Sequence, residues 1–520
     1  MRYRSRFIRS GLTLTAVALA MRTVSMLFGA FISRAVGAEG MGIYTAVMTV
    51  YSFAVTLATS GISLTVTRLV AEAIGKGREG DVGSILRSSA VYSLAFSAIS
   101  SLALFFGAEL IGGSILSDSR TVPAFRILSL SLTGVGLCSV LSGYFIGVRR
   151  VGFNAVVQVA SQLARMVLTV FLVTKTRGQG IVRTVSALCI GITLTELLSL
   201  VLVFAEFMLD RRLHPTRAAK KTCVGVKDVA SAAIPLGVSS YVRSVLTTIE
   251  HILIPKRLIG RGESGEEAYS HYGLLHGMAL PVVLYPMSPL SSFSGLLVPE
   301  FASDFARADN ERMSRVASEA LNTTLSYSAV VAVLLYVFSE ELGYVIYGSY
   351  DVGGYISMLA PIIPIMYLDH VTDNVLKGIG EQVYSMWVNI ADSLLSVALV
   401  FFLIPVFGIT GYALVIIIME GFNFVLSLTR LTGKIRIKLH FLKSLVSPLC
   451  CSLAAGKIAD ALFLFGGSTS PAPWIVLKVL FTLCLIFAFI GAARAIRPVF
   501  HRKRSDKSHG GRAINCTEEP

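Results

Sequence analysis

Residues 10–33 read S-G-L-T-L-T-A-V-A-L-A-M-R-T-V-S-M-L-F-G-A-F-I-S, an apolar run that contains a single charge, Arg22. About 20 consecutive apolar residues are enough for a helix to cross the hydrocarbon core of a bilayer. A charge near the centre of such a helix costs about 3 to more than 10 kcal/mol, so it usually faces a protein interior or a water-filled path. The run therefore predicts a transmembrane helix whose Arg22 faces a polar interior.

The rest of the chain has the same apolar character. Hydrophobic residues make up 54% of the 520 residues, charged residues make up 15%, and the mean hydropathy is +0.71. At about 35 residues per helix and connection, roughly fourteen transmembrane helices fit, and the chain is predicted to be an all-α polytopic membrane protein. We expect the helices at 10–34, 41–73, 83–112, 122–148, 151–174, 182–209, 228–255, 269–300, 316–346, 352–376, 380–405, 409–431, 441–465 and 473–496. The second of them is expected to break near Ser60 and Gly61.

The distribution of basic residues predicts the orientation in the membrane. Lysines and arginines fall mainly in the N-terminus, the even-numbered connections and the tail, and the formal net charge is +15. Because cytoplasmic connections retain positive charge, both termini are predicted to be cytoplasmic. The same topology, together with anionic lipid headgroups, explains the basic connection 210–228 and the tail, so we expect no nucleic-acid partner.

Nothing in the sequence indicates a cofactor. The seven cysteines and eight histidines are dispersed, without the spacing of a disulfide framework or a metal site. Neither H-E-x-x-H nor the phosphate-binding G-x-x-x-x-G-K-[ST] pattern occurs. We therefore expect no cofactor, no metal and no enzymatic activity.

An internal repeat organises the chain. G-V-R-R-V-G-F-N-A-V-V-Q-V-A from Gly147 is similar to G-I-G-E-Q-V-Y-S-M-W-V-N-I-A from Gly378, at a spacing of about 231 residues. Such repeats are a common construction of secondary transporters, in which two halves surround a central cavity. We expect an N-terminal six-helix lobe at 1–215, a C-terminal six-helix lobe at 216–435, two additional helices within 436–496 and a basic cytoplasmic tail at 497–520.

Several motifs resemble those of one known family. They are M-R-T-V-S-M-L-F-G-A-F-I-S-R-A-V-G-A-E-G-M-G-I-Y from Met21, S-G-I-S-L-T-V-T-R-L-V-A-E-A from Ser60, G-Y-F-I-G from Gly143, Q-V-A-S-Q-L-A-R from Gln158 and H-Y-G-L-L-H-G-M-A-L-P from His271. The chain resembles the stage V sporulation protein B branch of the polysaccharide and lipid-linked oligosaccharide flippases. These are related to lipid II flippases and multidrug exporters in the multidrug/oligosaccharidyl-lipid/polysaccharide exporter superfamily.

The resemblance implies a function in the bacterial cytoplasmic membrane. A flippase of this family would move a lipid-linked saccharide, such as a peptidoglycan or spore-envelope precursor on an undecaprenyl pyrophosphate carrier, to the outer leaflet by alternating access. Its partners would be this substrate, membrane lipids, a coupling cation and envelope-synthesis proteins. Two alternatives remain open: a cation-coupled multidrug antiporter of the same fold, and a transport-inactive scaffold for envelope synthesis.

Arginines are the predicted substrate ligands because their planar, permanently charged groups suit phosphate oxygens. Arg22 and Arg243 occupy comparable places near the start of each half, and Arg243 has an alternative role as an ion-pair partner of Glu250. Gln158, Gln162 and Arg165 share a helix face that would either line the cavity or bond neighbouring helices.

This sequence departs from the family pattern at two positions. It has Gly29 where another basic residue is common in the first helix, and Ser161 where a carboxylate is common. Because of the missing basic residue at position 29, the cavity is expected to be less basic than usual, which gives Arg22 a larger share of any phosphate binding.

Acidic residues inside the predicted spans are candidates for binding a coupling ion. They are Glu196, Glu250, Asp369, Asp373, Asp392, Glu420 and Asp460. We select Glu250, which shares a helix face with Arg243, and the pair Asp369 and Asp373, which lie four residues apart on one helix. A packing role is the alternative for each of them.

Overall fold

The computed structural model describes residues 2–59, 61–176, 178–213, 224–463 and 482, and every element among them is helical. The helices are α1 (Arg2–Thr59), α2 (Ile62–Gly75), α3 (Val82–Phe106), α4 (Val122–Ser129), α5 (Leu132–Gly147), α6 (Val151–Thr176), α7 (Ile181–Leu213), α8 (Val226–Arg261), α9 (Gly265–Tyr272), α10 (Leu280–Leu284), α11 (Ser288–Ala306), α12 (Asn310–Val337), α13 (Ser339–Tyr347), α14 (Asp351–Leu359), α15 (Ile363–Gly378), α16 (Gln382–Phe407), α17 (Ile409–Lys434) and α18 (Ser447–Phe463). Short 3₁₀ and π segments connect several of them.

The predicted all-α membrane fold is confirmed. Ten of the described helices or helix groups are long and apolar enough to cross a membrane, and two bent pairs raise the number to twelve. The first predicted span is the part of α1 before Gly37, the second is the rest of α1 together with α2, and each later span up to residue 463 corresponds to one helix or to consecutive helices. The last predicted span, 473–496, lies outside the described residues, so the expected total of about fourteen is compatible with the structure.

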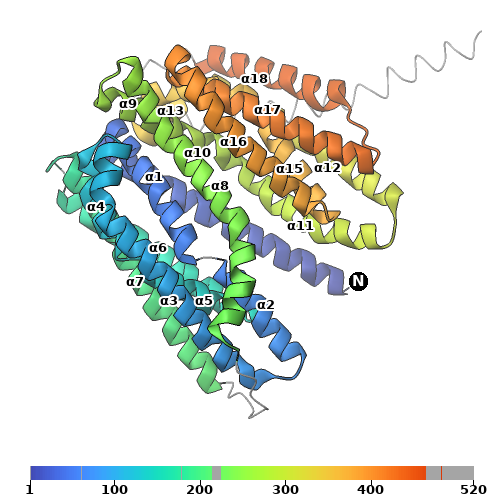
Figure 1. Ribbon diagram of the computed structural model, residues 1–520. Helices are drawn as coiled ribbons and strands as arrows, with labels where there is room; N and C mark the ends of the chain where they lie inside the picture. Colours follow the sequence, from blue (N-terminus) through green and yellow to red (C-terminus); the bar gives the residue numbers. More distant parts are fainter. Residues whose placement is uncertain (1, 60, 177, 214–223, 464–481, 483–520) are drawn as a thin grey trace, which may run out of the picture.

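Glycines with positive φ divide the first helical region. Gly37 has φ 75° inside α1, and Figure 1 shows α1 turning back near α9. Gly61, with φ 67°, precedes α2 at the predicted break. Glycine adopts positive φ angles more readily than any other residue, so these two positions set where the helices bend.

Prolines and irregular turns divide the eighth and tenth predicted spans. The π-helix η4 (Gly273–Ala279) follows α9, and the 3₁₀ turn η5 (Tyr285–Met287) separates α10 from α11. In the tenth span the 3₁₀ turn η6 (Ala360–Ile362) separates α14 from α15. Proline removes a backbone hydrogen bond and clashes with the preceding turn, which explains the 3₁₀ breaks at Pro286 and Pro361.

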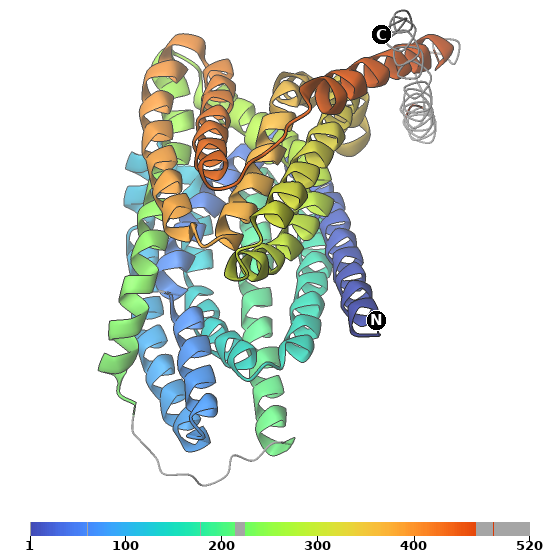
Figure 2. The ribbon, with the colours of Figure 1, turned by 90° about the vertical axis from the view of Figure 1, so that its right-hand side faces the viewer.

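The hydrophobic core is shared at one end of the molecule and divided at the other. One cluster of buried side chains joins both halves of the chain, from Ala30 to Met419. The buried residues of a second cluster all belong to the sequence range 62–233, and those of a third cluster belong to 297–435. Accordingly, the N-terminal helices α2–α7 and the C-terminal helices α11–α17 meet near α9 and diverge toward the opposite end (Figures 1 and 2).

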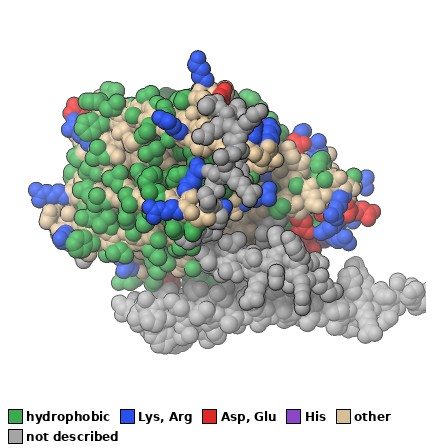
Figure 3. Space-filling model, turned by 90° about the horizontal axis from the view of Figure 1, so that it is seen from below, with side chains coloured by type: hydrophobic (Ala, Val, Ile, Leu, Met, Phe, Trp, Pro, Cys, Tyr) green, Lys and Arg blue, Asp and Glu red, His purple; other side chains and the backbone are tan. Residues whose placement is uncertain are grey.

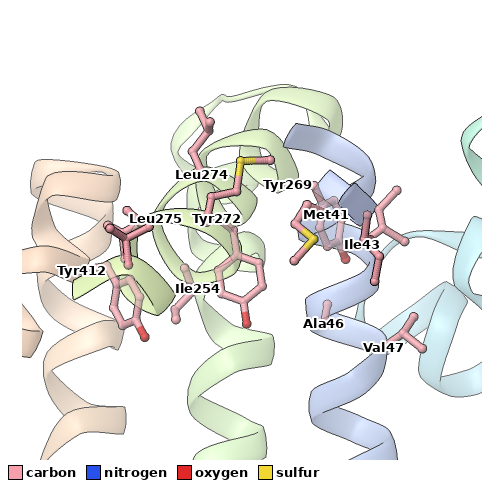
Figure 4. Close-up of a cluster of buried hydrophobic side chains, with 14 of the residues drawn as sticks. Met41, Ile43, Ala46, Val47, Ile254, Tyr269, Tyr272, Leu274, Leu275 and Tyr412 are labelled. Carbon is pink, nitrogen blue, oxygen red and sulfur yellow. The ribbon is translucent and has the colours of Figure 1, made fainter. Parts of the chain in front are cut away.

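The shared end contains a contact between two backbones, which we call the closed junction. There the second part of α1, after Gly37, crosses α9 and η4, and Figure 4 shows the side chains of both packed together. A Cβ on Gly42 would lie 1.8 Å from the Tyr269 carbonyl oxygen, and one on Gly273 would lie 2.2 Å from the Ala38 carbonyl oxygen. Glycine at both positions therefore permits the close approach.

The diverging end carries the more basic connections. The turns after α2, α11 and α17 lie at this end, away from α9 and α13 (Figure 1). Viewed from below, the described surface shows Lys and Arg side chains more prominently than Asp and Glu (Figure 3). We call this the basic end.

Candidate functional site

Arg22 lies where the first part of α1 passes the C-terminal helices. Its guanidinium Nη2 donates to the Leu284 carbonyl oxygen at 3.2 Å, and its side chain is exposed. Beside it, the Thr23 and Tyr285 hydroxyls are 2.7 Å apart. No described carboxylate forms an ion pair with Arg22. The arginine is thus held by one carbonyl and keeps further donors available to a ligand.

The polar face of α6 approaches α1 one turn from Arg22. Gln162 Nε2 lies 3.5 Å from the Ser25 hydroxyl, and Ser25 follows Arg22 by three residues on the same face of α1. Gln158 is exposed on α6. The structure therefore brings Gln162, but not the whole predicted face, to the surroundings of Arg22.

Arg165 has a different environment from Arg22. It forms an ion pair with Glu196 of α7, and the two side chains are 31% and 19% exposed. The contact joins neighbouring helices α6 and α7, which pack closely along their lengths. This geometry favours the structural alternative for Arg165 that the sequence left open.

Arg243 is exposed on α8, the long helix that contacts both groups of helices. It forms no ion pair with a described residue, although it lies within electrostatic range of Asp392 on α16. The next residue, Ser244, donates to the Thr56 hydroxyl of α1 at 3.3 Å. The expected alternative pairing with Glu250 is not formed, because Glu250 instead accepts from the Ser396 hydroxyl at 2.7 Å.

Carboxylates gather between α15, α16 and α17. Asp369 lies beside Ser427, Asp392 accepts from Asn423 at 3.0 Å, and Glu420 lies within electrostatic range of both acids. Asp373 is directed elsewhere and pairs with Lys377 at 2.5 Å. Of the predicted helical pair, therefore, only Asp369 belongs to this group. Among the described residues, no group of side chains has the arrangement of a metal site.

Sequence reasoning did not group Asp369 with Asp392 and Glu420. All three were recognised as acids inside spans, but they belong to three separate helices. A regular four-residue spacing within one helix can be found in a sequence. The approach of three helices requires the tertiary structure.

Sequence reasoning also missed the polar contacts that surround the closed junction. Arg34 donates to the Ile346 carbonyl oxygen at 3.0 Å and also to that of Val345, which joins α1 to the end of α13. Arg120 pairs with Asp118 at 2.8 Å and with Glu39 at 2.6 Å. Basic residues near predicted helix ends were the only available signal.

The sequence matches a known family over more than half of its length. Residues 7–305 match the family model described as polysaccharide biosynthesis protein. The chain belongs to the polysaccharide biosynthesis protein family. Residues 287–402 also match the MatE model, as expected for the superfamily that the motifs indicated.

Curated relatives extend this membership along the chain. Stage V sporulation protein B of Bacillus subtilis (strain 168) is 26% identical over 500 residues, covering 93% of this chain and 95% of that protein. Lipid II flippase MurJ of the same organism is 22% identical over 407 residues, covering 74% of each chain. The predicted resemblance is confirmed.

Solved structures share the fold. Lipid II flippase MurJ in an inward closed conformation superposes with a TM-score of 0.69 at 14% identity, covering 94% of this chain and all of that one. An inward-facing multidrug resistance MATE family transporter of the MOP superfamily gives a TM-score of 0.62 at 16% identity, covering 81% and 98%. The protein is therefore a multi-pass membrane protein with the fold of these two structures, which are named a flippase and a transporter.

Proposed function

We propose that this protein is a flippase that moves a lipid-linked saccharide across the bacterial cytoplasmic membrane by alternating access. The single observation that carries the proposal is the state of Arg22 and Arg243. Both are exposed in spans that lie between the two groups of helices, and neither forms an ion pair with a described carboxylate. Buried or membrane-embedded cations are usually paired, so an available pair of arginines fits an anionic ligand.

The ligand chemistry that fits best is a pyrophosphate. Each guanidinium group supplies several planar donors that suit phosphate oxygens. Gln162 and the hydroxyls of Thr23 and Tyr285 add neutral donors near Arg22 that suit a saccharide. The polyprenyl tail would remain in the bilayer while the headgroup passes between the two groups of helices.

The proposed cycle follows from the divided core. The closed junction seals one end, whereas the two groups of helices diverge at the basic end. With both termini cytoplasmic, the diverging end would accept substrate from the inner leaflet. Release on the other side would require the backbones at Gly42 and Tyr269 to separate.

The carboxylates of α15–α17 support coupling of lipid transport to the movement of a cation. Asp369, Asp392 and Glu420 lie together without a basic ion-pair partner among the described residues, and Glu250 lies within electrostatic range of Asp392. We infer that a monovalent cation or proton neutralises this group during the cycle. A cation-coupled multidrug antiporter would also use such carboxylates, so the experiment below also tests that second function.

A flipping assay tests the proposal directly. The purified protein is reconstituted in liposomes with a fluorescent undecaprenyl-pyrophosphate saccharide, and flipping is measured by the accessibility of the headgroup to an impermeant quencher. We expect R22A and R243A to lose most of the activity, while R87A, which removes an exposed arginine near the start of α3, retains it. Full activity in both site variants would reject this mechanism. Transport of cationic drugs in place of the lipid would indicate the antiporter, and no transport of either would indicate the scaffold.

A further inference from the structure

An extended segment links α17 to the last described helices at the basic end. It has the sequence I-R-I-K-L-H, residues 435–440, and Figure 2 shows it running between α17 and α18. Ile435 is buried, and Ile437 and Leu439 pack against the same core cluster. Arg436, Lys438 and His440 alternate with them and are exposed. This two-residue period places the basic side chains on one face of the segment.

Three polar residues of α12 hold the backbone of this segment. Ser314, Ser318 and Asn322 follow one another at four-residue intervals, so they form a row along one side of the helix. Ser314 donates to the Arg436 carbonyl oxygen, and Ser318 accepts from the Lys438 amide at 3.0 Å. Asn322 donates to the Lys438 carbonyl oxygen at 2.8 Å and accepts from the His440 amide at 2.9 Å.

These bonds fix the backbone that carries the basic row. Side chains two residues apart in an extended segment are separated by about 7 Å along the chain, so Arg436 and Lys438 lie side by side. A flexible basic loop would lose more conformational freedom on binding an anion. The tethered segment holds its cations in place before the anion binds, so binding costs less conformational entropy.

A groove of about 740 Å³ lies between this segment and the start of α12. Arg315, Arg436 and Lys438 line it, and none of them forms an ion pair with a described residue. Lys434 also lines the groove but pairs with Glu381 at 3.2 Å. Among the described residues of the lining, Glu311 is the only acidic one. The groove therefore has an excess of positive charge and no internal counter-ion that balances it.

The groove adjoins exposed apolar side chains at the ends of three candidate spans. It lies where the candidate span of α12 begins and that of α17 ends, and the candidate span Leu442–Ala459 begins just beyond it. Phe441 is 56% exposed and Leu442 is 80% exposed. A cationic groove beside exposed apolar side chains at the end of several spans matches the two parts of a phospholipid.

We propose that this groove binds the phosphate headgroup of an anionic membrane phospholipid such as phosphatidylglycerol. Arg315, Arg436 and Lys438 contact the phosphate, and the acyl chains lie along Phe441 and Leu442. The tail of this chain does not suit the groove, because residues 494–507 are themselves strongly basic. The site is separate from Arg22 and Arg243, so it would regulate or stabilise the transporter independently of substrate binding.

Binding to the full-length protein tests this site. Detergent-solubilised protein is titrated with fluorescent phosphatidylglycerol, with phosphatidylcholine of the same chain length, and with inorganic phosphate as competitor. We expect tighter binding of phosphatidylglycerol than of phosphatidylcholine, with little competition by phosphate. The triple variant R315Q, R436Q and K438Q should weaken phosphatidylglycerol binding at least tenfold, because each basic residue near the surface adds roughly fivefold to affinity.

A matched triple variant controls for total charge. R87Q, R149Q and K227Q remove two arginines and one lysine that are exposed outside the groove, and their binding should equal that of the native protein. Equal binding of both lipids, an equal effect of both triple variants, or complete competition by phosphate would overturn the proposal. If the groove triple variant does not fold, R436Q alone should still weaken binding several-fold, and its failure to do so would also overturn the proposal.

Discussion

Gly42 lies against the backbone of Tyr269 so closely that an added Cβ would be 1.8 Å from the Tyr269 carbonyl oxygen. This contact joins two segments that are more than two hundred residues apart in sequence and closes one end of the molecule. In an alternating-access transporter, a contact of this kind is formed in one state and broken in the other. It therefore identifies a position at which the balance between states can be changed.

Gly42→Leu should separate the closed junction. Overpacking a closely packed site typically costs about 1–3 kcal/mol, which the protein can relieve by separating α1 from α9 and η4. A cysteine pair placed across the junction should then cross-link less efficiently than in the native protein. Gly29→Ala is the control, because no atom lies within 4 Å of its added Cβ. Unchanged cross-linking in Gly42→Leu would contradict the role of this contact.

Arg22→Lys should retain only part of the activity that Arg22→Ala loses. A lysine keeps the charge but not the planar, multiple-donor geometry of the guanidinium. Loss of a charge-assisted hydrogen bond is worth about 1.5–3 kcal/mol, or roughly a tenfold to hundredfold reduction in substrate affinity. Binding of the lipid-linked substrate, measured separately from flipping, gives this affinity. Equal affinity in the lysine, alanine and native proteins would exclude Arg22 from substrate binding.

Arg165→Ala should act mainly on stability. Its ion pair with Glu196 is only partly exposed, so removing one partner should lower the free energy of unfolding by about 1–3 kcal/mol. The double variant with Glu196→Ala should be less destabilised than the sum of the single variants, since neither charge is then left unpaired. Thermal unfolding of the four proteins measures this coupling. Strict additivity, together with loss of substrate affinity in Arg165→Ala, would support a ligand role instead.

Asp392→Asn should reduce the dependence of flipping on cations. Asp392 belongs to the carboxylate group of α15–α17, whereas Asp373 is neutralised by Lys377. Flipping rates are measured against sodium concentration and against pH. We expect Asp392→Asn to abolish the response to one of these variables and Asp373→Asn to preserve both. An identical response in the two variants would remove the basis for a coupling site here.

Glu381→Gln tests the electrostatics of the turn between α15 and α16. Hydrogen bonds from Arg430 hold the pKa of Glu381 below its ordinary value, and Lys434 lowers it further. A carboxyl with a lowered pKa in the folded state stabilises the protein above its unfolded pKa, and that contribution disappears as the pH falls through the folded value. The variant should therefore be less stable than the native protein at neutral pH and low salt, and the difference should vanish in acid. A difference that persists at low pH would point to packing instead.

The helical architecture was largely predictable because the bilayer requires it. Apolar runs near 20 residues long can satisfy their backbone hydrogen bonds in lipid only as helices or closed barrels. The break at Gly61 was also predictable, since glycine tolerates the positive φ found there. The irregular turn η4 was not, because a π-helix has no clear sequence signal.

The candidate site was predictable in part. The expense of placing Arg22 in an apolar run identified it without a structure, and the repeat suggested Arg243. By contrast, Arg165 was placed in the same group because its helix face is polar, and only the structure shows its pairing with Glu196. Asp373 was grouped with Asp369 by spacing, but in the structure it forms an ion pair with Lys377 instead.

The sequence by itself determined the membrane fold, the family and the isolated charge of Arg22, because each depends on local composition or on motifs read along the chain. The tertiary structure decided which charges have partners. Arg22 and Arg243 form no ion pair with a described carboxylate, whereas Arg165 pairs with Glu196. Asp369, Asp392 and Glu420 come together from three helices. The basic row at 435–440 is hydrogen-bonded to α12. Ion pairs and hydrogen bonds act over a few ångströms, so they depend on which helices become neighbours rather than on distance along the sequence.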